Sequence, residues 1–118
     1  MVYRKYHNRK VVFAGHNFDS QAEANRYQEL VLLQRAGKIK ELELQPRFLI
    51  QEEFTYQGKK ERKIEYVADF MYKEFVDKDC MMVRTVVEDV KGMKTDVYKL
   101  KRKLFLARYP LIDFREIM

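Results

Sequence analysis

The sequence has a single cysteine, two histidines, no tryptophan and no long hydrophobic run. One cysteine excludes an intramolecular disulfide and a zinc site made only of cysteines, and it favours a reducing compartment. The first residues lack the apolar core of a signal peptide, and no apolar stretch reaches transmembrane length. We therefore expect a cytoplasmic protein that does not enter a membrane. His7 and His16 lie in a polar, basic segment without metal-ligand spacing.

What the chain does contain is enough apolar mass for one folded unit. Hydrophobic residues make up 47% of the 118 positions, and eight Phe and eight Tyr supply core volume. We predict a single domain over residues 1–118, with a basic N-terminal arm or hairpin at 1–18 and a core at 19–118. The formal charge of +6 favours a polyanionic partner such as DNA or RNA, although many basic domains bind neither.

Local patterns predict an α/β or α+β fold with a mixed sheet. Ser20 and Glu23 match a capping box at the start of a helix, and Gly37 is suited to end it. Pro46 should break or bulge the strand that follows, and Pro110 should end the second helix. In that helix, four apolar residues at helical spacing predict the buried stripe Val97, Leu100, Leu104 and Ala107. The predicted order is helix, three strands, helix and strand, over residues 19–37, 39–54, 63–75, 82–90, 95–108 and 111–117.

Two of the predicted strands carry charges where a buried strand would have another valine. One contains Asp69, and the other contains Asp89 followed two residues later by Lys91. A buried charge is costly unless it is paired or binds a metal. Side chains alternate along a strand, so Asp89 and Lys91 share one face and Glu88 takes the other. If Asp69 faces the same side, two carboxylates and an ammonium group converge; a register slip of one residue would exchange Glu88 for Asp89.

Such a constellation suits metal-dependent cleavage of a phosphodiester. Paired carboxylates are good ligands for Mg²⁺ (or Mn²⁺), and the carbonyl of Val90 is a plausible further ligand. A metal there can polarise a phosphate and lower the pKa of a bound water. Lys91 could position or deprotonate that water, or offset charge in the transition state. The simpler alternative, a structural ion pair between Asp89 and Lys91, stays open.

The chain resembles the PD-(D/E)xK nuclease superfamily, and more closely a small family of phage-encoded nuclease-like proteins of unknown function. The segments that carry the resemblance are 18–23, 44–46, 66–70, 88–92 and 98–101. The resemblance implies an αβββαβ core, with Asp69 as the first motif acid and Asp89-Val90-Lys91 as the acid-x-lysine motif. It also implies a helical acid, here Glu23, although Glu23 could simply cap its helix. Ala68 stands where the nominal motif has proline.

From this we expect a Mg²⁺-dependent DNA endonuclease, with branched phage recombination or replication intermediates as possible substrates. The expected partners are DNA and either a second copy of the chain or a phage replication or recombination protein. A non-catalytic nucleic-acid-binding or assembly module with the nuclease fold is the alternative. The candidate nucleic-acid contacts are basic residues near the N-terminus and around the second helix: Arg4, Lys5, Arg9, Lys94, Lys99, Lys101 and Arg102.

Overall fold

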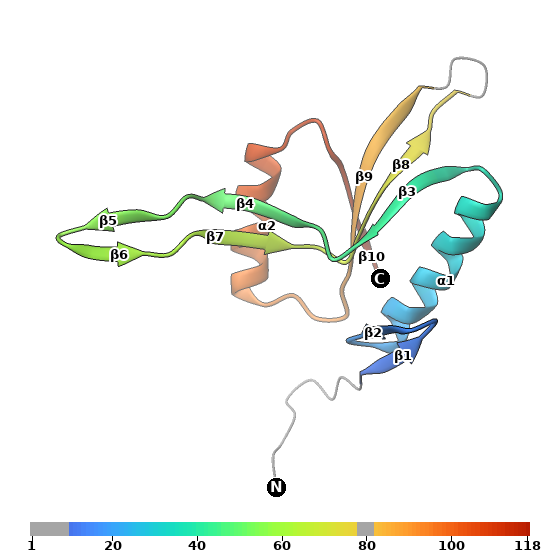
Figure 1. The fold of residues 1–118 in the computed structure, drawn as a ribbon, viewed down its shortest axis with the longest axis horizontal. Helices are drawn as coiled ribbons and strands as arrows, with labels where there is room; N and C mark the ends of the chain where they lie inside the picture. The colour runs from blue at the N-terminus through green and yellow to red at the C-terminus, as the bar shows by residue number, and fades with distance from the viewer. Residues whose placement is uncertain (1–9, 78–81) are drawn as a thin grey trace, which may run out of the picture.

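The computed structural model describes residues 10–77 and 82–118 (Figure 1). Within these ranges neither helix is long and apolar enough to cross a membrane. The helices are α1 (Gln21–Arg35) and α2 (Asp96–Arg108). The strands are β1 (Val11–Phe13), β2 (His16–Phe18), β3 (Ile39–Leu44), β4 (Arg47–Gln51), β5 (Phe54–Tyr56), β6 (Lys59–Glu61), β7 (Ile64–Val67), β8 (Phe70–Phe75), β9 (Val83–Val90) and β10 (Asp113–Ile117).

The central sheet has four strands in the order β10-β9-β8-β3. Strand β10 is parallel to β9, whereas β8 pairs antiparallel with both β9 and β3. The parallel pair requires a crossover, and α2 supplies it between β9 and β10. The predicted α+β class with a mixed sheet is therefore confirmed.

Both helices begin directly after a capping residue, which for α1 is the predicted Ser20. Ser20 has extended backbone angles, and its hydroxyl accepts a hydrogen bond of 3.1 Å from the Glu23 N–H. Thr95 caps α2 in the same way by accepting from the Tyr98 N–H. Gly37 follows α1 with a φ of 75°, a conformation that favours glycine.

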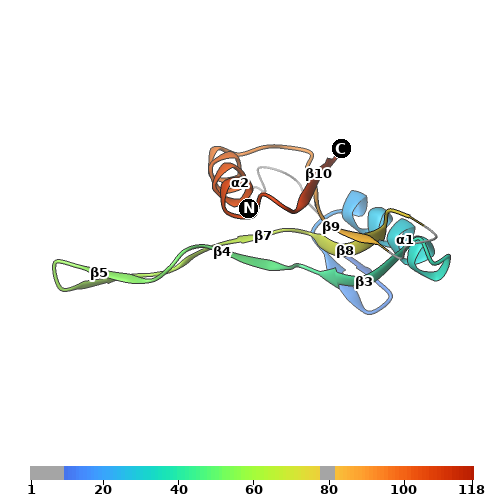
Figure 2. The same cartoon turned by 90° about the horizontal axis from the view of Figure 1, so that it is seen from above.

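The two predicted strands 39–54 and 63–75 form one long hairpin that bends sharply as it leaves the sheet. At the bend, the Gln45 N–H donates to the carbonyl of Asp69 and the Ala68 N–H donates to the carbonyl of Pro46. Pro46 has no N–H for a continuous ladder, and Gln45 has a φ of 50°. Each predicted strand is consequently divided: β4–β7 continues the hairpin against α2, and β5–β6 projects beyond it (Figures 1 and 2). Asp69 lies at this bend.

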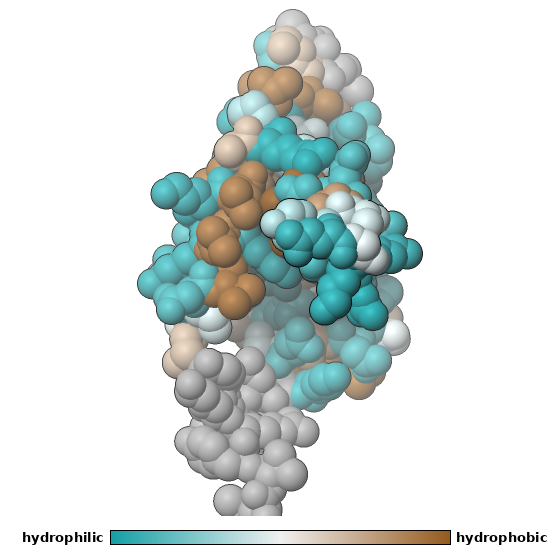
Figure 3. All heavy atoms as spheres, turned by 90° about the vertical axis from the view of Figure 1, so that its left-hand side faces the viewer, coloured by the Kyte–Doolittle hydropathy of each residue, from teal (hydrophilic) through white to brown (hydrophobic). Residues whose placement is uncertain are grey.

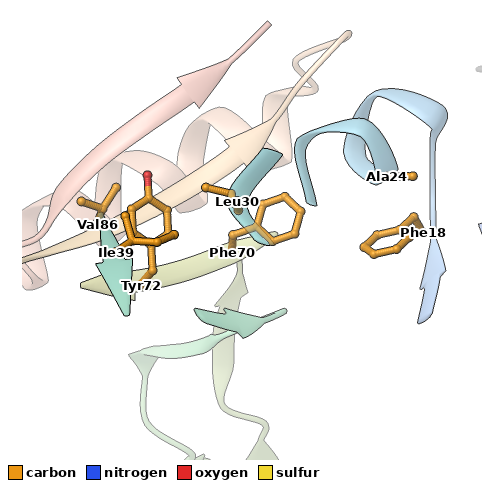
Figure 4. Close-up of a cluster of buried hydrophobic side chains, with 7 residues drawn as sticks. All are labelled: Phe18, Ala24, Leu30, Ile39, Phe70, Tyr72 and Val86. Carbon is orange, nitrogen blue, oxygen red and sulfur yellow. The ribbon is translucent and has the colours of Figure 1, made fainter. Parts of the chain in front are cut away.

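Separate hydrophobic clusters cover the two faces of the sheet. The cluster on the α1 face is Phe18, Ala24, Leu30, Ile39, Phe70, Tyr72 and Val86 (Figure 4). The cluster on the α2 face is Phe48, Ile50, Tyr66, Ala68, Val87, Tyr98 and Phe105. Neighbouring residues of β9 thus alternate between the two cores, because successive side chains of a strand point to opposite faces.

The predicted buried stripe of α2 is wrong. Val97, Leu100, Leu104 and Ala107 are all exposed. The helix instead buries Tyr98 and Phe105, and the Phe105 ring lies 4.8 Å from Phe48 and 5.0 Å from Tyr66 between centroids. Aromatic rings bury more area than aliphatic side chains, so the aromatic face packs inward and the aliphatic face turns outward.

Candidate functional site

Asp69 is held at the bend of the long hairpin by backbone contacts from two strands. Its own N–H donates to the carbonyl of Glu88, and its carboxylate accepts a hydrogen bond of 2.6 Å from the Val90 N–H. Burial raises the pKa of Asp69 to about 8, and the carboxylates of Asp89 and then Glu23 raise it further. The Val90 hydrogen bond and the Lys91 ammonium act in the opposite direction. Burial and two neighbouring acids thus disfavour the ionised form of this carboxyl group.

Asp89 in β9 and Lys91, the residue directly after its end, lie on the same side, as strand alternation predicts. Asp89 is 1% exposed and accepts a hydrogen bond from the Tyr66 hydroxyl. Burial and this hydrogen bond raise the pKa of Tyr66 well above its ordinary value, so the phenol stays a donor. Lys91 Nζ lies 3.1 Å from Asp89 Oδ1 and 4.6 Å from the centre of the Tyr98 ring. Asp89 Oδ1 is buried, and the Lys91 ammonium is its polar contact among the described residues.

Glu23 comes to the same place from the first turn of α1. It is buried, and burial raises its pKa, with further increases from Asp19 and from Asp89. A contact with the carboxyl of Asp69 lowers it, so the two groups are neighbours. Its backbone N–H is capped by Ser20, but the carboxyl itself points into the acidic cluster. Helix capping and membership of the site are therefore compatible for Glu23.

Glu23 and Asp69 border two open clefts. A cleft of about 640 Å³ is lined by residues that include Glu23, Asp69 and Lys91, and one of about 400 Å³ is lined by Lys10, His16 and the same two acids. Glu23 and Asp69 thus border both clefts, whereas Asp89 is buried behind them and lines neither. A large polyanionic substrate could reach Glu23 and Asp69 without the fold opening.

The donor set fits Mg²⁺ better than a zinc-type site. In the described ranges, 10–77 and 82–118, no three His, Cys, Asp or Glu side chains form a ready metal-binding cluster. Mg²⁺ does not need one, because it keeps several waters and is usually held by one or two carboxylates together with substrate phosphates. Asp69 and Asp89 supply two such carboxylates, and a cation at Asp89 would share its Oδ1 with the Lys91 ammonium, which lies 3.1 Å away. The predicted role of the Val90 carbonyl stays a prediction; its N–H binds Asp69.

Glu88 belongs to the opposite face and to a different network. Its carboxylate is fully buried and forms a bidentate pair with Arg26, with Nε–Oε1 and Nη2–Oε2 distances of 2.7 Å. The Tyr72 hydroxyl donates a further hydrogen bond. An arginine suits this carboxylate because its planar guanidinium matches both oxygens. A register slip that would bring Glu88 into the site is excluded.

The structure describes some of the predicted nucleic-acid contacts but not those near the N-terminus. Arg4, Lys5 and Arg9 lie outside the described residues. Lys94 and Arg102 both approach Glu116, at 3.5 Å and 3.7 Å, so their charge is partly neutralised. Lys99 and Lys101 lie on α2 and do not line either cleft.

Three residues in or near the site were not among the predicted site residues. Tyr66 orients Asp89, Arg26 neutralises Glu88, and Asp19 lines both clefts beside Glu23. The sequence did hold a signal for Tyr66: a tyrosine in a predicted buried strand needs a hydrogen-bond partner for its hydroxyl group. The Arg26–Glu88 pair joins residues 62 positions apart and had no local signal.

Comparisons with known proteins identify a family without assigning a biochemical role. No curated protein and no solved structure matched the chain. A family described as "Protein of unknown function (DUF1064)" matches residues 3–118, almost the whole sequence. The match includes both helices, the whole sheet and every residue of the acidic cluster. The chain therefore belongs to the DUF1064 family.

Proposed function

We propose that this protein is a metal-dependent DNA endonuclease of the PD-(D/E)xK type. The observation that carries the proposal is the convergence of Asp69, Asp89 and Glu23 with a single ammonium group, Lys91, beside an open cleft. With all three acids ionised, a single ammonium group would leave an excess of buried negative charge, and the raised pKa values of Asp69 and Glu23 reflect that cost. A divalent cation would balance that excess of two negative charges.

Asp69 and Asp89 are the residues that would hold Mg²⁺ or Mn²⁺, with Glu23 close enough to support the bound waters or a second ion. When bound, the ion supplies Lewis acidity to a phosphate oxygen and acidifies a water. The fold orients both carboxylates before any metal binds. The Val90 N–H fixes the orientation of the Asp69 carboxylate, and the Tyr66 hydroxyl occupies one oxygen of Asp89.

Lys91 is the residue suited to act on the reacting groups. Its ammonium lies beside Asp89 and over the Tyr98 ring, and the residue lines the larger cleft. From there it can orient the attacking water and stabilise negative charge that develops on the phosphate. Tyr98 donates to Glu116 at 2.7 Å, so the ring beneath Lys91 is itself held in place.

DNA is the proposed substrate because the chain carries a formal charge of +6 in spite of this acidic cluster. Cytoplasmic action on branched phage replication or recombination intermediates, alone or with a phage partner protein, is the corresponding biological proposal. It rests on analogy with the resembling superfamily. Lys99 is a candidate phosphate contact outside the cleft.

The test is a cleavage assay on supercoiled plasmid, single strands and four-way junctions, with Mg²⁺, with Mn²⁺ and with chelator. We expect cleavage that depends on the metal, and a loss of about 10²-fold in Lys91→Ala, because an electrostatic or proton-transfer group has been removed. Lys40→Ala, at an exposed lysine outside the clefts, is the matched control and should cleave normally. If the wild type binds DNA but cleaves none of the substrates, with or without metal, the result would instead support the non-catalytic binding module.

A further inference from the structure

The β5–β6 arm, residues 52–63, is a surface that neither the core nor the candidate site uses. It extends the long hairpin beyond β4–β7 and is exposed along its whole length (Figures 1 and 2). Its two strands form a two-stranded sheet of their own. An isolated two-stranded hairpin is marginally stable in water, so the arm adds little to the stability of the fold. Its chemistry has to be read from its exposed side chains.

One strand of the arm carries a basic run. Four of five consecutive residues are cations: Lys59, Lys60, Glu61, Arg62 and Lys63. The other strand contributes Glu52 and Glu53, so the arm has four cations against three carboxylates. Lys60 lies 3.4 Å from Glu53, whereas Lys59 and Arg62 form no ion pair with the described residues. A concentrated basic run on an exposed element is typical of contact with nucleic-acid phosphates.

Two exposed aromatic rings lie on one face of the arm. Phe54 and Tyr56 are 49% and 61% exposed and stand two residues apart in β5. Tyr56 is directly opposite Lys59 in the strand register, so the ring and the ammonium group share this face. Aromatic rings beside cations bind unpaired nucleotides, because each base can stack on a ring while its phosphate contacts a cation. A duplex hides the faces of its bases from such rings.

The other face of the arm is also cationic. Lys60 is the neighbour of Lys59 in β6 and therefore points to the opposite face. There it lines an open cleft of about 610 Å³ with Arg62, Lys63 and Glu53. A ribbon with cations on both faces fits between two phosphate backbones, one on each side.

Nucleic acid matches this arm better than a protein partner. Figure 3 views the molecule from the side toward which the arm projects, and the end of the arm that faces the viewer is mainly hydrophilic. Protein–DNA interfaces are more polar and more positively charged than protein–protein interfaces. A second copy of the chain is disfavoured as the partner, because each copy carries a formal charge of +6.

The arm is joined to the acidic cluster by continuous strand. Lys59 and Lys63 precede Asp69 by 10 and 6 residues. In extended chain this is a length of about 20–33 Å. The same length of DNA is about 6–10 base pairs. A DNA molecule that is held on the arm can therefore reach the clefts beside Asp69.

We propose that the β5–β6 arm binds DNA at a point where two strands separate. Its cations contact the two backbones, one on each face, and Phe54 and Tyr56 stack on unpaired bases. The proposal rests on the proposed nuclease function for its choice of DNA, and it assigns recognition of forked or branched substrates to a surface outside the clefts.

Fluorescence anisotropy of labelled DNA with chelator tests the proposal, because binding is then measured without cleavage. The probes are a fork with two unpaired tails, a fully paired duplex of equal length and a single strand. Wild type should bind the fork at least about tenfold more tightly than either other probe. The double substitution of Phe54→Ser with Tyr56→Ser should reduce the preference for the fork over the duplex to about twofold or less and leave duplex affinity unchanged.

A second double substitution tests the phosphate contacts. Lys59→Ala with Arg62→Ala should lower the slope of log K against log salt concentration on the fork by about 2, one for each lost phosphate contact. Lys38→Ala with Lys40→Ala is the matched control and should leave the slope unchanged. It removes the same charge from exposed lysines where α1 is followed by β3, at the other end of the molecule (Figure 1). Circular dichroism should show native secondary structure in all variants.

Three results would overturn the proposal: no preference of the wild type for the fork, a preference that survives loss of both aromatic rings, or an equal change of slope in both lysine variants. An arm that contacts an acidic protein instead would leave DNA binding unchanged in every arm variant, which also overturns it. The measurement contains no metal, so failure of the arm variants leaves the proposed nuclease activity untouched. Absence of cleavage in the separate assay likewise leaves the binding result in force.

Discussion

Replacement of Arg26 by methionine is expected to lower the free energy of unfolding by about 3–5 kcal/mol, because it leaves the Glu88 carboxylate buried without its cation. Glu88 is fully buried, and Arg26 supplies two of its hydrogen bonds. The Tyr72 hydroxyl that remains can solvate only part of a full negative charge. Urea unfolding followed by circular dichroism at pH 7 measures the loss.

If loss of the Arg26–Glu88 ion pair causes the destabilisation, two further results are expected. A second substitution, Glu88→Gln, should recover at least half of the loss, since the amide is neutral and still accepts from Tyr72. The loss should also shrink toward pH 4, where an unpaired Glu88 can be buried as the neutral acid. Arg47→Met, which removes an exposed pair with Glu65, is the control and should change stability by less than about 1 kcal/mol. A loss of similar size in both variants would contradict the proposed role of burial.

Asp69→Asn is expected to make the metal-free protein more stable and the enzyme inactive. The pKa of Asp69 in the folded protein is about 8, far above its usual value of 3.8. Holding this group ionised in the fold is therefore unfavourable, and the neutral amide can still accept from the Val90 N–H. We expect a gain of about 2 kcal/mol at pH 8. The same substitution removes a proposed metal ligand, so cleavage should fall by at least about 10³-fold.

The pH dependence of the stability gain has a defined sign. Below pH 4 Asp69 is protonated in both the folded and the unfolded chain, and the variant should gain nothing. Between about pH 4 and 8 the unfolded chain releases the proton while the folded chain retains it, so wild-type stability falls as pH rises. The gain should therefore grow across this window and level off above it. Unfolding with chelator at pH 4, 6 and 8 measures it.

Asp96→Asn, at the exposed start of α2, is the control for charge removal alone. It should change stability by no more than about 1 kcal/mol and leave cleavage unaltered. If Asp69→Asn were destabilising at pH 8, the acidic cluster would be well compensated within the protein, and the argument for a missing cation would fail. If it kept full cleavage, Asp69 would not be a ligand.

The local features of the fold could be read from the sequence because each depends on residues close together in the chain. Ser20 caps α1 through a hydrogen bond that spans three positions, and the alternation of β9 places Asp89 with Lys91. The bend at Pro46 follows from the missing N–H of proline. These predictions are confirmed because chain geometry alone enforces them.

The inward face of α2 could not be read in the same way. Both an aliphatic stripe and an aromatic face repeat at helical spacing, and either could be buried. The choice depends on the partners that reach the helix, and here Phe48 and Tyr66 stack against Phe105. The partner of Glu88 was equally hidden, because Arg26 is 62 positions away.

The sequence by itself determined the order of the elements, the helix caps and the motif that carries Asp69, Asp89 and Lys91. Short-range sterics and hydrogen bonds decide these features, and they act within a few residues. Only the tertiary structure decided that Glu23 lies beside Asp69, that Glu88 pairs with Arg26 and that the aliphatic side chains of α2 face outward. Those outcomes depend on which distant side chains share a buried volume, and close packing and the cost of desolvating charge select among them.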